Sequence, residues 1–143
     1  MIILDTDAIT FLEHQQSATS KKLRDRLSIA SAEHRIVTTI VTYDEQTRGW
    51  IARFSKARSA EEVVEVYARL LRHVEIYCEM EIVPLTLDCE RRYRQLRAAK
   101  VRIGTHDLRI AAIALESKAI LYSRNLGDFR QVPGLAVVDW MQD

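Results

Sequence analysis

The run Ile36–Val41 (IVTTIV) is the feature that most constrains the fold, because every residue in it is β-branched. Such a run predicts a strand. Four further short apolar segments predict strands, at residues 2–4, 82–85, 119–122 and 135–138. Segments with apolar residues at helical spacing lie between them, at 17–33, 42–56, 59–80, 87–100 and 107–117. Strands that alternate with helices predict an α/β fold, with a parallel sheet covered on both faces.

The helix expected over 59–80 carries a long apolar stripe. Its members are Val63, Val66, Tyr67, Leu70, Leu71, Val74, Tyr77 and Cys78. A stripe of this kind usually faces the core. We therefore expect it to be mostly buried.

Length and composition predict one domain over residues 1–143, with a hydrophobic fraction of 48%. Lys and Arg number 21 against 20 Asp and Glu, so a polyanion partner would need a local basic patch. Cys78 and Cys89 are too few for a disulfide framework, and we expect reduced core thiols. Asp5 interrupts the apolar start after three residues, which does not fit a signal peptide. A cytoplasmic location is therefore expected.

Acidic residues occur repeatedly where a predicted strand gives way to a helix or loop. They are Asp5, Asp7, Asp44, Glu45, Asp107 and Asp128. If the strand ends gather at one edge of a parallel sheet, at least four carboxylates share one pocket. Like charges at such distances repel, so they need a counter-ion or raised pKa values. An all-oxygen site suits Mg²⁺ or Mn²⁺ and favours chemistry on phosphate esters.

Each acid also has a purely structural interpretation. Glu45 fits a capping box with Thr42, and Asp107 in a first helical turn would complement the helix dipole by about 0.3–1 kcal/mol. Asp128 beside Gly127 fits a turn. Asp5 is different, because we expect no local structural role for an acid that ends an apolar strand.

Four motifs in order carry a resemblance to a known family. They are Leu4-Asp5-Thr6-Asp7, Tyr43-Asp44-Glu45-Gln46-Thr47-Arg48-Gly49, His106-Asp107-Leu108-Arg109 and Ser123-Arg124-Asn125-Leu126-Gly127-Asp128-Phe129. Together they resemble the PIN-domain ribonucleases, and most closely the VapC-type toxins of bacterial toxin–antitoxin modules. The resemblance covers essentially the whole chain.

The resemblance implies a three-layer α/β/α sandwich with a parallel five-stranded sheet. It implies a Mg²⁺- or Mn²⁺-dependent endoribonuclease that cleaves tRNA or rRNA and inhibits translation. The catalytic and metal-binding acids would be Asp5, Glu45, Asp107 and Asp128. Thr6, Ser123 and Asn125 would support the site, with Ser123 in place of the more usual Thr.

The resemblance also implies partners. A cognate antitoxin would bind and neutralise the protein, and the chain would form a homodimer. Part of the 59–80 stripe, with the first helices, would supply one of these surfaces. Asp7 and His106 stand where many relatives have Asn, and we expect His106 to face solvent rather than act as the catalytic base.

Two basic clusters flank these motifs. The segment 91–102 carries six positive charges and no acid, and Arg48, Arg53, Lys56 and Arg58 follow Glu45. Basic faces bind the RNA backbone without reading its sequence. The RNA-binding residues expected from these clusters are Arg91, Arg94, Arg97, Lys100 and Arg48. A solvated helix face is the alternative for each residue, and the segment 91–102 fits an acidic partner tail equally well.

Two other functions fit part of the pattern. Asp5 and Asp7 after an apolar strand resemble the nucleophile and acid of haloacid-dehalogenase-like phosphatases, which would also use a lysine such as Lys118. A catalytically inactive PIN-like module that binds RNA or regulates is the other alternative. Loss of one or more acids would indicate that module, and all four are present.

Overall fold

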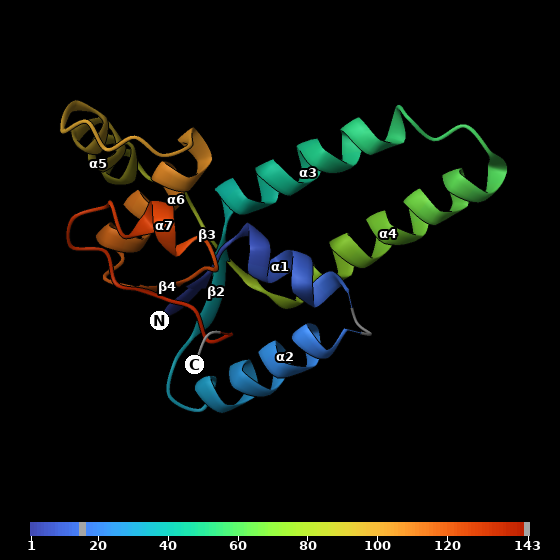
Figure 1. Cartoon of the computed structure of the whole chain (residues 1–143), viewed down its shortest axis with the longest axis horizontal. Helices are drawn as coiled ribbons and strands as arrows, with labels where there is room; N and C mark the ends of the chain where they lie inside the picture. The colour runs from blue at the N-terminus through green and yellow to red at the C-terminus, as the bar shows by residue number, and fades with distance from the viewer. Residues whose placement is uncertain (15–16, 142–143) are drawn as a thin grey trace.

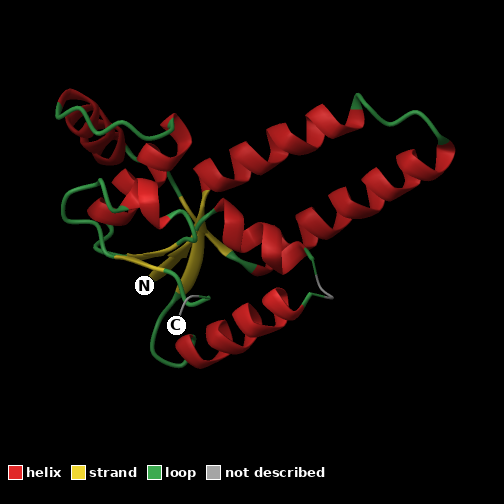
Figure 2. Cartoon of the chain, in the orientation of Figure 1, coloured by secondary structure: helices red, strands yellow, loops and turns green. Residues whose placement is uncertain are grey.

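The computed structural model describes residues 1–14 and 17–141, and its centre is a parallel sheet. The strands are β1 (Ile2–Leu4), β2 (Ile36–Thr39), β3 (Glu81–Val83), β4 (Ile120–Tyr122) and β5 (Val137–Val138). They lie in the order β3-β2-β1-β4-β5, and every pairing is parallel (Figure 2). The predicted α/β class and five-stranded sheet are confirmed.

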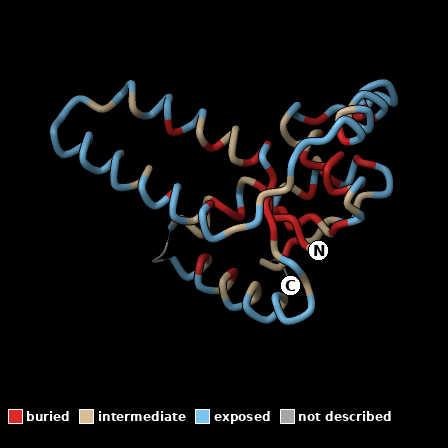
Figure 3. The backbone as a smooth tube through the Cα atoms, turned by 180° about the vertical axis from the view of Figure 1, so that it is seen from behind, coloured by how far each residue is buried: buried red, intermediate tan, exposed pale blue. Residues whose placement is uncertain are grey.

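Helices cover both faces of the sheet (Figure 1). One face packs against α1 (Thr6–Glu13), α2 (Ala18–Ala30) and α4 (Ala60–Glu79). The other packs against α5 (Leu87–Ala98), α6 (Thr105–Glu116) and α7 (Leu126–Phe129). Along β1, Ile2 and Leu4 enter the first core and Ile3 the second, as the alternation of a strand requires. The tube of Figure 3 shows the buried backbone concentrated at these strands.

The strand register determines which residues meet at the end of the sheet. Leu4 of β1 lies opposite Thr38 of β2 and Tyr122 of β4. The next residues, Asp5, Thr39 and Ser123, therefore lie at the same edge of the sheet, where Thr39 is the last residue of β2. All three are buried. This edge is where the acidic motifs were expected to gather.

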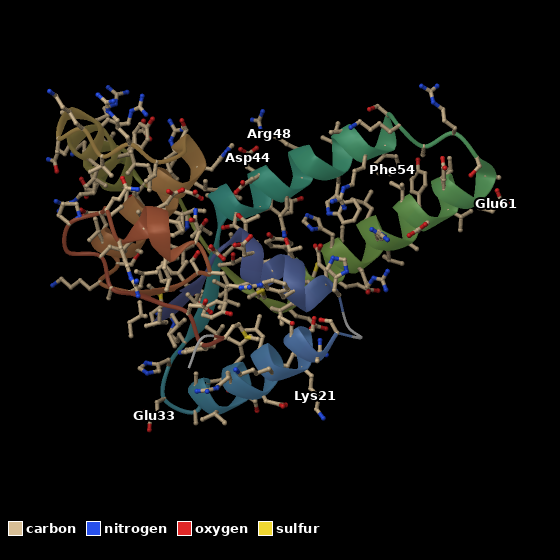
Figure 4. All side chains as sticks on the ribbon, viewed as in Figure 1. Lys21, Glu33, Asp44, Arg48, Phe54 and Glu61 are labelled. Carbon is tan, nitrogen blue, oxygen red and sulfur yellow. The ribbon has the colours of Figure 1, made fainter. Side chains whose placement is uncertain are left out.

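Helix α3 (Ile40–Phe54) and α4 form a hairpin that projects from the sheet (Figure 1). In α4 only His73 and Tyr77 are buried, whereas Val64 and Tyr67 are 69% and 59% exposed. The prediction that the apolar stripe of 59–80 is mostly core is wrong. The outer half of α4 lies beyond the sheet and packs on α3, for example through the edge-on contact of Phe54 with Tyr67. Figure 4 shows Phe54 at the far end of α3.

The start of α3 differs from the prediction. Thr39 is its N-cap and accepts a hydrogen bond from the backbone N–H of Thr42 at 3.0 Å. The strand predicted to reach Val41 therefore ends at Thr39, and the helix begins before Thr42. By contrast, the predicted start of α4 is confirmed, since Ser59 and Glu62 form a capping box.

Two short helices, α1 and α7, were not predicted. Helix α6 begins at Thr105, before the predicted start at residue 107, and Gly104 is its N-cap. Cys89 is buried as expected, but Cys78 is exposed on α4, and both are free thiols. Within residues 1–14 and 17–141, no helix combines the length and apolar character that a membrane span requires.

Candidate active site

Asp5 is buried at the carboxyl end of β1, where it is the N-cap of α1. Its Oδ1 accepts the backbone N–H of Ala8 at 3.1 Å, and Ser123 hydrogen-bonds to the same carboxylate. The expectation that Asp5 has no local structural role is wrong, because it caps the helix that follows it. Burial is the main cause that raises its pKa to about 7, and the negative charges of Asp7 and Asp107 contribute.

Glu45 reaches the same edge from the second turn of α3. Its Oε2 accepts a hydrogen bond from the hydroxyl of Thr6 at 2.6 Å. The alternative capping box with Thr42 is wrong, because the backbone N–H of Thr42 donates to Thr39 and Glu45 lies past the first turn. The Thr6–Glu45 bond joins two segments that are 39 positions apart.

Asp107 and Asp128 come from α6 and α7, and Asn125 lies between them. The side-chain amide of Asn125 donates to Asp128 Oδ2 at 2.9 Å and to Asp107 Oδ2 at 3.4 Å. The backbone N–H of Asn125 donates to the hydroxyl of Ser123 at 2.9 Å. Partial burial and the charges of Glu45, Asp128 and Asp7 raise the pKa of Asp107. The four acids from four chain segments therefore interact electrostatically, as the sequence predicts.

Asp44 has basic partners of its own. It pairs with Arg48 at 2.8 Å, as Figure 4 shows on α3, and with His106 Nε2 at 3.3 Å. His106 was expected to face solvent, but its side chain is only 37% exposed and bridges α6 to α3. Asp7 is exposed in the first turn of α1, where it contributes charge to the site.

A buried polar chain supports the Thr6–Glu45 pair, and it was not predicted from the sequence. The Tyr77 hydroxyl donates to Gln46 Oε1 at 2.7 Å, and Gln46 Nε2 donates to the Thr10 hydroxyl at 3.1 Å. Thr10 in turn donates to the backbone carbonyl of Thr6 at 2.9 Å. Gln46 follows Glu45 in the quoted motif, but nothing in the sequence connects it to Tyr77.

The buried pair of Glu13 and His73 was not predicted either. His73 Nδ1 lies 2.7 Å from Glu13 Oε1, and both side chains are almost wholly buried. The His73 ring packs against Tyr43 and Tyr77. This pair joins α1 to α4 at the base of the projecting hairpin.

A groove of about 850 Å³ extends from the site between α1, α3 and α4. Thr6 and Glu45 line it at the site, and Arg53, Arg69 and Arg72 line it on the hairpin. Its volume lies within the range of ligand-binding clefts.

The donor set fits a hard divalent cation. All of the acidic groups offer oxygen ligands. Burial raises the pKa values of Asp5 and Asp107, and repulsion from neighbouring carboxylates raises them further; a bound cation would relieve that repulsion. Among the described residues no three acidic, His or Cys side chains are already arranged to enclose a metal ion. This is compatible with Mg²⁺, which keeps several waters and is held by one or two carboxylates together with substrate phosphate.

Several of the basic residues expected to bind RNA have carboxylate partners. Arg91 pairs with Asp88 at 3.1 Å, Arg94 with Glu90 at 3.7 Å, and Arg48 with Asp44. Arg97 and Lys100 are exposed at the end of α5 and beyond it. Their contact with RNA stays a prediction.

The lysine required by the phosphatase alternative lies at the wrong edge of the sheet. Lys118 precedes β4, whereas Ser123 and the acidic site follow it. Lys118 is exposed there. The length of β4 therefore separates it from Asp5, so this alternative does not fit the fold.

Comparison with known proteins finds relatives that share this fold along nearly the whole chain. The chain is 25% identical over 138 residues to Ribonuclease VapC1 of Haemophilus influenzae (strain R2866), covering 96% of each chain. Its fold is similar to VapBC-1 from nontypeable Haemophilus influenzae, with a TM-score of 0.75, 23% identity and 99% of each chain covered. It is also similar to VapBC2 from Rickettsia felis bound to a DNA fragment from their promoter, with a TM-score of 0.74, 21% identity, and 98% and 99% of the two chains covered.

The family model described as PIN domain matches residues 2–135. That range contains the whole acidic site and four of the five strands. The chain therefore belongs to the PIN domain family.

Proposed function

We propose that this protein is a divalent-metal-dependent endoribonuclease, the toxin of a toxin–antitoxin pair. The observation that carries the proposal is the convergence of Asp5, Glu45, Asp107 and Asp128 at one sheet edge, where neighbouring acids raise the pKa of Asp107. The likeness to Ribonuclease VapC1 over nearly the full length supports the same activity.

The four acids would hold Mg²⁺ or Mn²⁺, directly or through water. When bound there, the ion supplies activation of water and stabilisation of charge at the scissile phosphate. Thr6 fixes the orientation of Glu45, Ser123 that of Asp5, and Asn125 holds Asp107 beside Asp128. These hydrogen bonds prearrange the carboxylates before a ligand enters.

We further propose that the substrate is tRNA or rRNA, that its cleavage inhibits translation, and that the attacking group is water. Hydrolysis of this kind leaves a 5′-phosphate and a 3′-hydroxyl. Products that carry a 2′,3′-cyclic phosphate would show that the ribose 2′-hydroxyl attacks instead, and would overturn this part of the proposal.

An antitoxin partner and a homodimer are part of the proposal. The two solved structures of similar fold described above are VapBC assemblies. The exposed apolar residues of α4, among them Val64, Tyr67 and Leu71, offer area for a protein partner. Light scattering on the purified chain tests the dimer, since a mass near twice 16.5 kDa is expected.

Metal binding distinguishes the proposed nuclease from the alternative of an inactive PIN-like module, which would bind no metal at this site. Calorimetric titration with Mn²⁺ is expected to give a saturable signal that Asp107→Ala weakens strongly. The matched control is Asp88→Ala, which removes an exposed acid on α5 that has no part in the site. A protein with no saturable signal would favour the inactive module.

A further inference from the structure

We propose that the groove between α1, α3 and α4 binds the RNA strand on one side of the scissile phosphate, with Arg53 and Arg72 contacting its phosphates. The inference rests on the proposed nuclease function and assigns a subsite to it. Of the two basic clusters expected from the sequence, it uses the one that contains Arg53 rather than the segment 91–102.

The groove is continuous with the acidic site. Thr6 and Glu45, which are hydrogen-bonded to each other, line its inner end. A strand whose phosphate lies at the carboxylates therefore has an open path along the groove toward the projecting hairpin. The groove volume of about 850 Å³ suits a few nucleotides of single strand.

The cations at the outer end of the groove are available for phosphate. Arg69 is already paired with Glu65 at 2.6 Å. Arg53 lies over the Trp50 ring at 4.9 Å, and Arg72 is exposed. In the part of the chain that the structure describes, neither Arg53 nor Arg72 forms an ion pair with a carboxylate.

The acids around the groove bind partners other than Arg53 and Arg72. Glu13 is occupied by His73, and Glu65 by Arg69. Glu62, in the adjoining cleft that Arg53 also lines, accepts the backbone N–H groups of Arg58 and Ser59. Among the described residues, Arg53 and Arg72 are therefore the cations of the outer groove that no carboxylate pairs with, whereas Glu45 makes the inner end negative.

Hydroxyl groups between the two ends favour RNA over an apolar peptide. Thr10, Ser17 and Thr19 line the wall, and Trp50 is only 7% exposed. Hydroxyl and guanidinium groups are common partners of nucleic-acid phosphate and ribose. The strand in the groove is expected to be single-stranded, as in most sequence-specific RNA recognition.

The test measures binding separately from cleavage. Binding of a fluorescently labelled single-stranded RNA is measured by anisotropy in EDTA over a range of salt concentrations. For Arg53→Gln/Arg72→Gln, the slope of log affinity against log salt is expected to shrink by about 1.4, since each single-strand phosphate contact contributes about 0.7. The KM for cleavage is expected to rise while kcat stays the same.

Two further variants keep the test specific. Arg53→Lys/Arg72→Lys preserves both charges and is expected to keep the original salt slope. Arg26→Gln/Lys118→Gln removes two cations that lie toward the opposite edge of the sheet, in the second half of α2 and before β4. This control is expected to leave both the slope and KM unchanged.

If Arg53→Gln/Arg72→Gln has the same salt slope and the same KM as the unmutated protein, the inference is overturned. A protein partner would then be the candidate occupant of the groove. An equal decrease of the slope in the control variant would overturn it as well. Failure of the nuclease proposal is distinguishable, because it appears as the absence of cleavage while RNA binding in EDTA persists.

Discussion

The hydroxyl of Thr6 donates a 2.6 Å hydrogen bond to the carboxylate of Glu45, and so joins the first residue of α1 to the second turn of α3. The bond matters because Asp5, the neighbour of Thr6, is fixed by its own capping bond to Ala8. Two acids from distant segments thus acquire a defined relative position before any ligand binds.

Removal of the Thr6 hydroxyl should impair activity without unfolding the protein. Thr6→Val keeps the shape of the side chain but leaves Glu45 without its donor, so we expect a loss of about 10–100-fold in metal affinity or activity. Thr6→Ser restores a hydroxyl and should recover most of the loss. Equal losses for Thr6→Val and Thr6→Ser would contradict the positioning role; calorimetry with Mn²⁺ and initial rates provide both readouts.

The raised pKa of Asp5 predicts how stability depends on pH. A carboxyl whose pKa is higher in the folded chain stabilises the fold below its unfolded pKa, and that contribution is lost as the pH rises through the folded value. For Asp5 the loss runs from about pH 4, the ordinary range, to about 7. The Tm of the metal-free protein should fall across this window, and saturating Mg²⁺ should reverse the fall at pH 8.

Asp5→Asn serves as the control for this pH effect. Asn also caps helices well, so the variant keeps the α1 cap while it removes the titrating group. Its Tm should fall less between pH 4 and 7, with the remaining fall arising from Asp107, whose pKa is also raised. A pH profile of Tm identical in the two proteins would be inconsistent with the burial of an ionisable Asp5.

The side-chain amide of Asn125 donates a hydrogen bond to the Asp107 carboxylate, and this bond lowers the pKa of Asp107. In Asn125→Ala both Asp107 and Asp128 lose this donor, so the pKa of Asp107 should rise and activity should fall by about tenfold or more. The measurement is kcat/KM against pH. Asn125→Ala should need a higher pH than the unmutated protein to reach half of its maximum, and an unchanged midpoint with unchanged rate would count against the bridge.

The Tyr77 hydroxyl should stabilise the fold through Gln46. Tyr77→Phe leaves Gln46 Oε1 without its donor in a buried position, which should lower the free energy of unfolding by about 1–2 kcal/mol. Urea denaturation measures the change. Tyr67→Phe is the matched control, because Tyr67 is 59% exposed and its loss of a hydroxyl should have little effect.

The sequence predicts the fold class and the acidic set because both follow from local patterns. β-branched runs identify the strands, and the parallel arrangement places the residues after them at one edge. Asp5, Glu45, Asp107 and Asp128 are accordingly brought together.

The errors arise where the pattern of a segment does not show what its residues contact. Asp5 caps α1, a helix too short to leave a clear apolar period in the sequence. Tyr77 and His73 have the helical spacing of core residues, yet their polar atoms bind Gln46 and Glu13 from other helices. Similarly, the apolar stripe of α4 follows the pattern of a buried helix, but its outer half extends past the sheet that would cover it.

The nuclease proposal is tested most simply by an endonuclease assay with purified protein on total tRNA and rRNA. The assay compares Mg²⁺ or Mn²⁺ with EDTA, and the unmutated protein with Asp107→Asn, which changes a site acid without removing the α1 cap at Asp5. We predict discrete cuts that disappear with EDTA and fall by at least about 100-fold in Asp107→Asn. Cleavage that persists in EDTA or in Asp107→Asn would contradict the proposal, as would the absence of any cleavage by folded, metal-loaded protein.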